Sequence, residues 1–304
     1  MPTRELRKEP PPQSVRQRLA ARLPLALLRH LIYRRRTGRW GNFRNPSLYS
    51  EKMQWRIIND RRAIVGLSGD KVASAELAVE RCRDAGITLS RPRLLASDRD
   101  PGQLIENLKQ LEREGRLPAA WVLKPNHSSR RVLITEGDPD WDLLQESARR
   151  WMLPDDMVGV SWMWSYAMAE RKVIAEELIT DAGKRPIEWS VYVFDGNIAF
   201  FNVSQKKDDE VIDTWRSPTW EDLGRMRRRP RANLALETAP DYLPLMAACA
   251  TAIGAGWDHV RIDLYWADQR VWFGETTAYP MEGTGFASPL VDKELGERWR
   301  LHER

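Results

Sequence analysis

Cysteine is scarce in this sequence: Cys82 and Cys249 are the only two among 304 residues, and no recognisable spacing joins them. This excludes a disulfide framework, argues against a zinc site and fits a reducing compartment. No apolar run reaches the roughly eighteen residues that a membrane span needs. Arginines at positions 16, 18, 22 and 29 interrupt the N-terminal region, which argues against a signal peptide. The sequence therefore predicts a cytoplasmic protein.

Acidic residues are also scarce near the N-terminus. Residues 1–45 hold twelve lysines and arginines against two glutamates, a net charge of +10, so the rest of the chain must carry −5 to give the overall +5. From Ser14 to Tyr33 apolar residues recur near helical spacing, although Pro24 should kink or split the helix. The region 14–45 can lie on an anionic membrane, or pack on the body of the protein with its arginines in solvent. Residues 1–12 are rich in proline and charge and are expected to be disordered.

The next part of the chain, up to about residue 118, alternates helical and strand patterns. Three helices are expected: one from Ser50 that buries Met53 and Ile57, one capped by Asp70, and one from Asp100 to Gly115. The second helix should end at Gly86 and carries an apolar stripe of Val72, Ala75, Val79 and Cys82.

Strand patterns dominate the remainder. The segments AAWVLK and RVLITE flank a polar loop, a helix capped by Asp138 follows, and KVIAEELI is a further strand. Residues 187–205 read as a hairpin around Asp195 and Gly196, and residues 259–279 read as another. Hairpins that bracket helices predict an α+β fold with antiparallel sheets.

One apolar run ends in a lysine and is followed at once by the polar loop. Residues 121–132 read WVLKPNHSSRRV, with Lys124 at the end of the run and Ser128 and Ser129 in the loop. Hydroxyls, backbone N–H groups and an ammonium group can together hold phosphate. A lysine at the end of a strand can equally point into solvent, so this segment alone does not identify a site.

The second hairpin places two carboxylates on one face. Strand alternation puts Arg261 and Asp263 on the same side, and a three-residue loop from Asp268 to Arg270 would pair Asp263 with Glu275 and Arg261 with Thr277. Two negative charges about 5 Å apart repel by roughly 3 kcal/mol at an effective dielectric near 20. Mg²⁺ would satisfy such hard oxygen ligands, whereas the alternatives are solvation or salt bridges to Arg261. A loop of two or four residues would turn Glu275 away.

Six segments occur in a fixed order: SGDK, WVLKPNHSS, VIAEELI, IEWSVYVFDG, VRIDLYW and FGETTAYPMEGTGFASP. Together they resemble the ATP-grasp superfamily, and within it the teichuronopeptide-biosynthesis (TupA-like) ATP-grasp family, over roughly residues 46–297. The resemblance implies a nucleotide held between two α+β subdomains with antiparallel sheets, plus a basic N-terminal helical arm. The expected parts are the arm (1–45), an α/β substrate-side domain (46–118), a small ATP-grasp subdomain (119–182) and a catalytic subdomain (183–304).

The resemblance also implies roles for individual residues. Lys71 and Lys124 would bind the phosphates of ATP, and Lys124 and Arg261 would stabilise charge in the transition state. Adenine would meet the backbone of Glu176, Glu177 and Leu178, ribose would meet Glu188, and Mg²⁺ would be held by Asp263, Glu275 and Thr277.

The chain departs from the family pattern at three places. Relatives carry glycines where this loop reads Ser128, Ser129, Arg130 and Arg131, so that hydroxyls and guanidinium groups would have to replace contacts of a freer backbone. Ser190 stands where many relatives have lysine, and Thr277 where many have asparagine.

The function that the resemblance implies is ATP-dependent ligation of a carboxylate to an amine through an acyl phosphate, on a uronic acid or related cell-envelope glycan. One alternative is a kinase of a sugar or polyol hydroxyl, and another is a nucleotide-binding protein without catalysis. The arginine-rich segments supply charge but no nucleic-acid recognition module, so binding to nucleic acid is not favoured. The sequence leaves the oligomeric state open.

Overall fold

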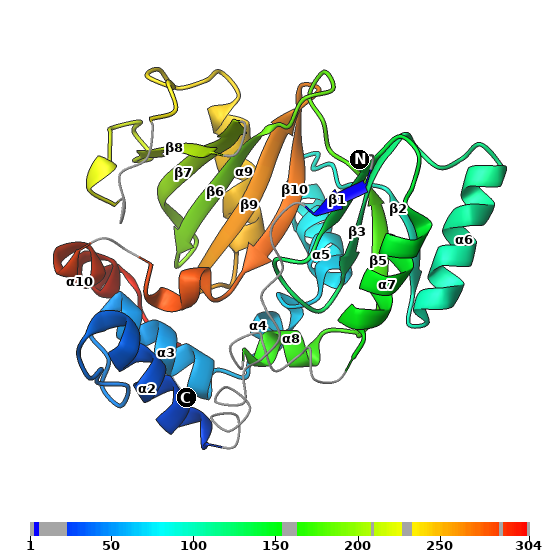
Figure 1. The fold of residues 1–304 in the computed structure, drawn as a ribbon. Coiled ribbons are helices and arrows are strands. Elements are labelled where there is room, and N and C mark those ends of the chain that lie inside the picture. The colour runs from blue at the N-terminus through cyan, green and yellow to red at the C-terminus, as the bar shows by residue number, and fades with distance from the viewer. Residues whose placement is uncertain are drawn as a thin grey trace. The chain divides into compact units, whose positions relative to one another are not determined.

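The computed structural model describes residues 3–5, 23–153, 163–207, 210–226, 233–285 and 288–302. They form two compact units, each built on a five-stranded antiparallel sheet, so the observed class is α+β with antiparallel sheets, as predicted (Figure 1). Unit 1 comprises Met1–Leu23, Gly69–Ala73 and Pro92–Ile179, and unit 2 comprises Pro24–Ser68, Ser74–Arg91 and Thr180–Arg304. Elements from residues 46–118 occur in both units, and the four-part division remains a prediction.

The sheet of unit 1 has the strand order β1-β4-β3-β5-β2. Its strands are β1 (Thr3–Glu5), β2 (Leu94–Asp98), β3 (Ala120–Pro125), β4 (Leu133–Glu136) and β5 (Val173–Glu177). The helices of this unit are α6 (Pro101–Arg113), α7 (Trp141–Trp151) and the short α8 (Trp164–Met168). Leu104 of α6, Trp151 of α7 and Trp121 of β3 meet in one fully buried apolar core. Because side chains alternate along a strand, Trp121 and Leu123 face this core while Lys124 faces the other side of the sheet.

Two details of unit 1 differ from the sequence expectation. Thr3–Glu5 form a strand antiparallel to β4, so the expected disorder of residues 1–12 is wrong for these three residues. The exposed edge of a sheet offers unpaired backbone groups to any extended segment, whatever its composition. The cap of α7 is Asp140, not Asp138: the Asp140 carboxylate accepts from the N–H of Leu143 at 3.0 Å.

The sheet of unit 2 has the order β10-β9-β6-β7-β8. Its strands are β6 (Ile187–Phe194), β7 (Asn197–Lys207), β8 (Glu210–Arg216), β9 (His259–Ala267) and β10 (Arg270–Thr277). Helix α9 (Leu243–Gly254) packs against β6, β7 and β9. In the register of β6 with β9, Tyr192 lies opposite Arg261 and Ser190 opposite Asp263. Alternation therefore puts these four side chains on one face, and the buried apolar residues between them on the other.

Further helices complete unit 2: α2 (Leu25–Thr37), α3 (Tyr49–Asn59), α4 (Ala63–Leu67), α10 (Pro289–Arg298) and the short η2 (Gly224–Met226) and η3 (Pro280–Gly283). Helix α3 buries Met53 and Ile57 as predicted. Helix α2 begins directly after Pro24, where a kink or break was expected, and the N-terminal part of the predicted 14–33 helix lies outside the described residues. No helix of the described residues has both the length and the hydrophobicity to cross a bilayer.

Helix α5 (Lys71–Asp84) contributes to both units, since Lys71–Ala73 belong to unit 1 and the rest to unit 2. Its predicted cap is confirmed, because the Asp70 carboxylate accepts from the N–H of Ala73 at 2.9 Å. Of the apolar stripe, Cys82 is buried and Val72, Ala75 and Val79 are half-buried; the other buried residues of the helix are Ser74 and Ala78. A face of small residues allows close packing of the helix, which a search for large apolar residues does not detect.

Candidate functional site

The predicted site residues fall into two clusters, one in each unit. The unit 1 cluster consists of Lys71, Lys124, Ser128, Ser129, Glu176, Glu177 and Leu178, and the unit 2 cluster consists of Glu188, Arg261, Asp263, Glu275 and Thr277. Each cluster has an internal geometry of its own.

In the unit 1 cluster, each lysine has a partner of its own. The ammonium of Lys124 forms an ion pair with Glu176 of β5, and both side chains are largely buried, with 17% and 11% exposed. The ammonium of Lys71, at the start of α5, donates to the backbone oxygen of Ser128 at 2.5 Å. Lys71 therefore contacts the loop that follows β3, and Lys124 lies in the strand that leads into that loop.

Asn126, which was not among the predicted site residues, fixes the start of that loop by hydrogen bonds. Its side chain is fully buried, donates to the backbone oxygen of Glu170 at 2.9 Å and accepts from the N–H of Val72 at 3.1 Å. It thereby ties the loop to the first turn of α5, which carries Lys71. An asparagine two residues after a strand-end lysine was the only available signal.

The loop contains no glycine, yet one of its residues has the left-handed backbone conformation that glycine usually adopts. Arg130 has φ 68°, in the left-handed region that glycine normally occupies. The hydroxyl of Ser128 is buried and makes no hydrogen bond within the described residues, whereas Ser129 is half-buried. A buried hydroxyl of this kind is a candidate donor to a bound oxyanion. Burial also lowers the pKa of His127 to about 4, so this neighbouring imidazole is neutral at pH 7.

The segment predicted to meet adenine is engaged in backbone hydrogen bonds. The N–H of Leu178 donates to the oxygen of Ala120 at 3.2 Å, and the N–H of Glu177 donates to the oxygen of Arg93 at 3.0 Å. The Glu177 carboxylate also lies 3.4 Å from the guanidinium of Arg93. For the predicted adenine contact, the N–H of Leu178 would have to exchange the carbonyl of Ala120 for an acceptor on the nucleotide.

In unit 2, the pairing of the two carboxylates is confirmed but the predicted loop is wrong. Asp263 lies opposite Glu275, and Arg261 opposite Thr277. The turn has only two residues, Asp268 and Gln269, whose φ angles are 50° and 56°. Positive φ at both residues is typical of two-residue turns whose twist matches that of the hairpin strands. A two-residue turn sets a strand register in which Glu275 would point to the face of the sheet opposite to Asp263.

A β-bulge at Gly274 corrects this register. Phe273 pairs with Leu264 and Glu275 pairs with Asp263, so Gly274 is the extra residue of β10. A Cβ at position 274 would lie 2.8 Å from the backbone oxygen of Asp263 and 2.8 Å from Cε2 of Tyr265. Glycine is therefore required where the two strands approach at the bulge.

Arg261 lies between the paired carboxylates. Its Nη2 is 2.5 Å from Oδ2 of Asp263, 3.2 Å from Oε1 of Glu275 and 3.2 Å from Oγ1 of Thr277. The structure thus contains the salt-bridged arrangement that the sequence analysis gave as an alternative to a metal ion. The carboxylates raise the pKa of Arg261 well above its ordinary value against the opposing effect of burial, so the guanidinium stays charged.

Asp263 is the most deeply buried acid of this cluster. Burial raises its pKa to about 7, the charges of Glu275 and Glu188 act in the same direction, and Arg261 opposes them. Its Oδ1 accepts from the hydroxyl of Ser190 at 2.7 Å. Ser190 was noted above only as a departure from the family pattern. Alternation along β6 puts it on the same face as Glu188, so its position in the site could have been predicted from that spacing.

The oxygen donors of the unit 2 cluster fit a hard divalent cation. Asp263, Glu275 and Thr277 supply two carboxylates and a hydroxyl on one face, and 41% of the Glu275 side chain is exposed. Within the described ranges no group of three or more His, Cys, Asp or Glu side chains could hold a metal ion. A cation with two carboxylate ligands needs oxygens from water or a bound phosphate, which is the usual situation of Mg²⁺.

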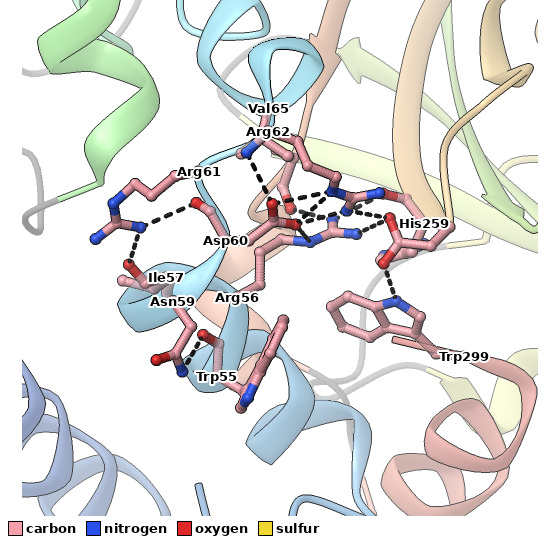
Figure 2. Close-up of polar contacts among 12 residues, drawn as sticks. Trp55, Arg56, Ile57, Asn59, Asp60, Arg61, Arg62, Val65, His259 and Trp299 are labelled. Carbon is pink, nitrogen blue, oxygen red and sulfur yellow. Dashed lines mark hydrogen bonds and ion pairs between the residues drawn. The ribbon is translucent and has the colours of Figure 1, made fainter. Parts of the chain in front are cut away.

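A buried network anchors the hairpin next to Arg261 and Thr277 (Figure 2). Arg56 of α3 is fully buried and donates through Nη1 to the backbone oxygens of His259 at 2.7 Å and Ala278 at 2.9 Å. Its Nη2 donates to Asp258 at 2.6 Å, and the same carboxylate accepts from the indole N–H of Trp299 at 2.8 Å. Arg56 therefore holds β9 and β10 together where their ladder ends.

His259 belongs to the same anchor. Its ring nitrogens lie 2.9 Å from the hydroxyl of Tyr49 and 2.9 Å from the backbone oxygen of Val193. Burial lowers its pKa to about 3, with the positive charge of Arg56 acting in the same direction. Neither Arg56 nor His259 could be recognised as an anchor from the sequence, because their partners are distant along the chain.

The family model described as TupA-like ATPgrasp matches residues 101–300, more than half of the chain. No curated protein matches. Similar solved structures include D-alanine–D-alanine ligase from Bacillus anthracis complexed with ATP, with 17% identity, 70% of this chain and 55% of that chain covered, and a TM-score of 0.41. The corresponding ligase from Helicobacter pylori has 13% identity, 77% and 62% coverage and a TM-score of 0.43.

A third similar structure is the ATP-grasp ligase PsnB complexed with minimal precursor, with 17% identity, 71% of this chain and 54% of that chain covered, and a TM-score of 0.36. The chain thus spans between 54% and 62% of the length of these three structures. Since their TM-scores lie below 0.5, the family match rather than these similarities identifies the fold.

Proposed function

The chain belongs to the TupA-like ATP-grasp family, and on this basis we propose that it is an ATP- and Mg²⁺-dependent ligase that joins a carboxylate to an amine. The observation that supports this proposal best is the pairing of Asp263 with Glu275 on the face that also carries Arg261. Two acids that face each other across a strand pair repel; Arg261 offsets that repulsion here, and the two carboxylates together supply oxygen ligands for a divalent cation.

The proposed reaction has two steps. An oxygen of the substrate carboxylate attacks the γ-phosphorus of ATP, the bond to the β-γ bridging oxygen breaks, and an acyl phosphate and ADP form. The amine nitrogen then attacks the acyl carbon, inorganic phosphate leaves, and the nitrogen loses a proton to give the amide. Neither step changes an oxidation state.

The unit 1 cluster would bind the triphosphate. The ammonium of Lys71 offers positive charge beside the loop, that of Lys124 offers a second charge at the end of β3, and the Ser128 hydroxyl offers a buried donor. The ammonium of Lys124 would leave the carboxylate of Glu176 and bind phosphate oxygens. Both the ion pair and the phosphate contact are charge-assisted, so one can replace the other. The backbone at Glu176, Glu177 and Leu178 would meet adenine.

The unit 2 cluster would stabilise the charge that develops on the transferred phosphoryl group. Asp263, Glu275 and Thr277 would hold Mg²⁺, which when bound supplies positive charge to the phosphate oxygens. Arg261 would supply a second positive charge from the same face, and Glu188 would bind the ribose hydroxyls. The carboxylate substrate would be a uronic acid or related cell-envelope glycan, by analogy with the family, and the amine an amino acid.

The test is product formation from ATP with pooled carboxylates and amines, detected by mass, in wild type and two variants. Asp263→Asn removes the negative charge of the most deeply buried acid and should reduce turnover by about a hundredfold or more. Asp268→Asn is the matched control, because it makes the same chemical change in the exposed turn of the same hairpin. Equal turnover in both variants would refute the assigned role of Asp263.

The same assay separates the rival functions. A kinase would release ADP with a hydroxyl substrate alone and would need no amine. A nucleotide-binding protein without catalysis would bind ATP without turnover across all substrates. The loop from Ser128 to Arg131 motivates this second rival, because its left-handed residue is an arginine rather than a glycine.

A further inference from the structure

Helix α2 buries an arginine beside Leu28 and Tyr33 and leaves two leucines exposed. Its inward face contains the fully buried Arg29, which donates to Gln54 at 2.8 Å and to Glu282 at 2.8 Å. The inward hydroxyl of Tyr33 lies 2.9 Å from that of Ser50 on α3, which packs beside α2 (Figure 1). Leu27 and Leu31, one turn apart, point outward with 46% and 43% of their surfaces exposed.

The outward face continues beyond the helix. Trp40 is 58% exposed, and its ring centroid lies 5.4 Å from the guanidinium carbon of Arg34. Arg34 and Arg35 follow Leu27 and Leu31 by one further turn and are both exposed. We call the set Leu27, Leu31, Arg34, Arg35 and Trp40 the α2 surface.

Within the part of the chain that the structure describes, Arg34 and Arg35 form no ion pair. No acidic residue occurs between Glu9 and Glu51, whereas the same stretch contains nine arginines and no lysine. Other arginines nearby are committed to internal ion pairs: Arg36 to Glu282 at 3.0 Å and Arg39 to Asp292 at 2.8 Å. Arginine is suited to phosphate because its planar guanidinium can donate two parallel hydrogen bonds.

We propose that the α2 surface docks this protein on an anionic phospholipid bilayer. Phosphodiester headgroups would pair with Arg34 and Arg35, while Leu27, Leu31 and the ring of Trp40 would enter the boundary between headgroups and acyl chains. Stable attachment of this kind needs an apolar and an electrostatic contribution together, and the α2 surface offers both. A nucleic acid would match the arginines but not the exposed leucines.

The docking surface is fixed to the unit that carries the paired carboxylates. Arg29 and Arg36 both contact Glu282, which lies in η3, a few residues after Thr277. Gln54 donates to the backbone oxygen of the same Glu282 at 2.7 Å. Attachment through α2 would therefore hold unit 2 at the bilayer. This inference depends on the packing of α2 in unit 2 and does not depend on the ligase proposal.

The experiment is co-sedimentation of the full chain with vesicles of phosphatidylcholine alone or with about one third phosphatidylglycerol, without ATP. Wild type should bind the anionic vesicles, and binding should weaken at least tenfold between about 0.1 M and 1 M salt. Inorganic phosphate at millimolar concentration should not release it, because docking needs a surface rather than a single anion.

Two double variants test the two contributions. Leu27→Ser with Leu31→Ser should reduce the partition coefficient about tenfold, and Arg34→Gln with Arg35→Gln should reduce it about thirtyfold. Leu245→Ser, at an exposed leucine of α9, is the matched control and should bind like wild type. All five positions are exposed, so thermal unfolding should confirm an intact fold in each variant.

Two results would overturn the proposal. One is wild-type binding that is no stronger to anionic than to zwitterionic vesicles. The other is binding by both double variants that equals that of wild type, since the attachment would then arise elsewhere in the chain. The readout involves no nucleotide or turnover, so failure of the ligase proposal would leave this test unaffected.

Discussion

Replacing Gly274 with alanine tests the claim that a bulge sets the register of the acidic hairpin. The new Cβ would lie 2.8 Å from the backbone oxygen of Asp263 and from Cε2 of Tyr265, whereas ordinary contact begins near 3.4 Å. The neighbours must therefore move by about 0.6 Å, and one of them is backbone that cannot rotate away. Overpacking of this kind typically costs about 1–3 kcal/mol.

The displacement also falls on the residue that would hold Mg²⁺. A misplacement of about 1 Å in a reacting geometry can cost on the order of a hundredfold in rate. For a shift of about 0.6 Å at Asp263 we expect Gly274→Ala to lose about tenfold or more in ATP turnover. If the bulge were expelled instead, Glu275 would turn to the opposite face and turnover would be lost.

The assay combines urea unfolding with ATP turnover. Gly224→Ala is the matched control, because its Cβ would lie 3.4 Å from a side-chain oxygen of Asp222, an ordinary contact. The control should unfold within about 0.5 kcal/mol of wild type. If Gly274→Ala matches the control in both stability and turnover, the bulge does not determine the site.

Three further predictions follow from the anchors of each cluster. Arg56→Met leaves the carboxylate of Asp258 without one buried partner and should cost about 3–5 kcal/mol in the free energy of unfolding by urea; a cost below about 1 kcal/mol would contradict the anchoring role. Because His259 has a pKa of about 3 in the folded protein and near 6.5 when unfolded, the unfolded state binds its proton first, so stability should fall as pH decreases from about 6.5, by up to about 1.4 kcal/mol per pH unit. His259→Gln should flatten that dependence, and an unchanged slope would reject it. Asn126→Ala should raise the KM for ATP more than it lowers kcat, with Asn107→Ala, on the exposed side of α6, as the control; equal effects in the two variants would contradict its role in the loop.

The local elements with strong turn and cap signals could be predicted from the sequence. Asp195 and Gly196 form the expected two-residue turn between β6 and β7, with φ 47° and 77°. The cap at Asp70 and the burial of Met53 and Ile57 were also predictable. These features depend on a few neighbouring residues, whose chemistry decides the backbone conformation directly.

The pairing of Asp263 with Glu275 was predicted correctly from two errors that cancel. The loop was taken to be one residue longer than it is, and the bulge at Gly274 adds that residue back. A glycine inside a strand pattern is a known sign of a bulge, so the signal was present in the sequence. Register depends on the sum of such local irregularities, which strand alternation alone does not reveal.

Contacts between distant segments could not be predicted. Arg56 meets the backbone of residues 259 and 278, and Arg29 meets Glu282, across more than two hundred residues of sequence. A helical wheel of α2 favours burial of its leucines, and Leu28 is buried, but Leu27 and Leu31 are exposed. Partners on α3 and η3 bury Arg29. The energetic advantage of that arrangement exists only when those partners are in place.

Neither compact unit is a continuous stretch of polypeptide. The chain passes from one to the other at five points, after residues 23, 68, 73, 91 and 179. A recombinant fragment ending at Ile179 would contain Met53 and Ile57 without the sheet of unit 2, and would leave their apolar surfaces in water. A fragment beginning at Thr180 would lack α3 and with it the guanidinium of Arg56. Domain dissection by truncation should therefore give aggregation-prone products, and binding studies on either half require the intact protein.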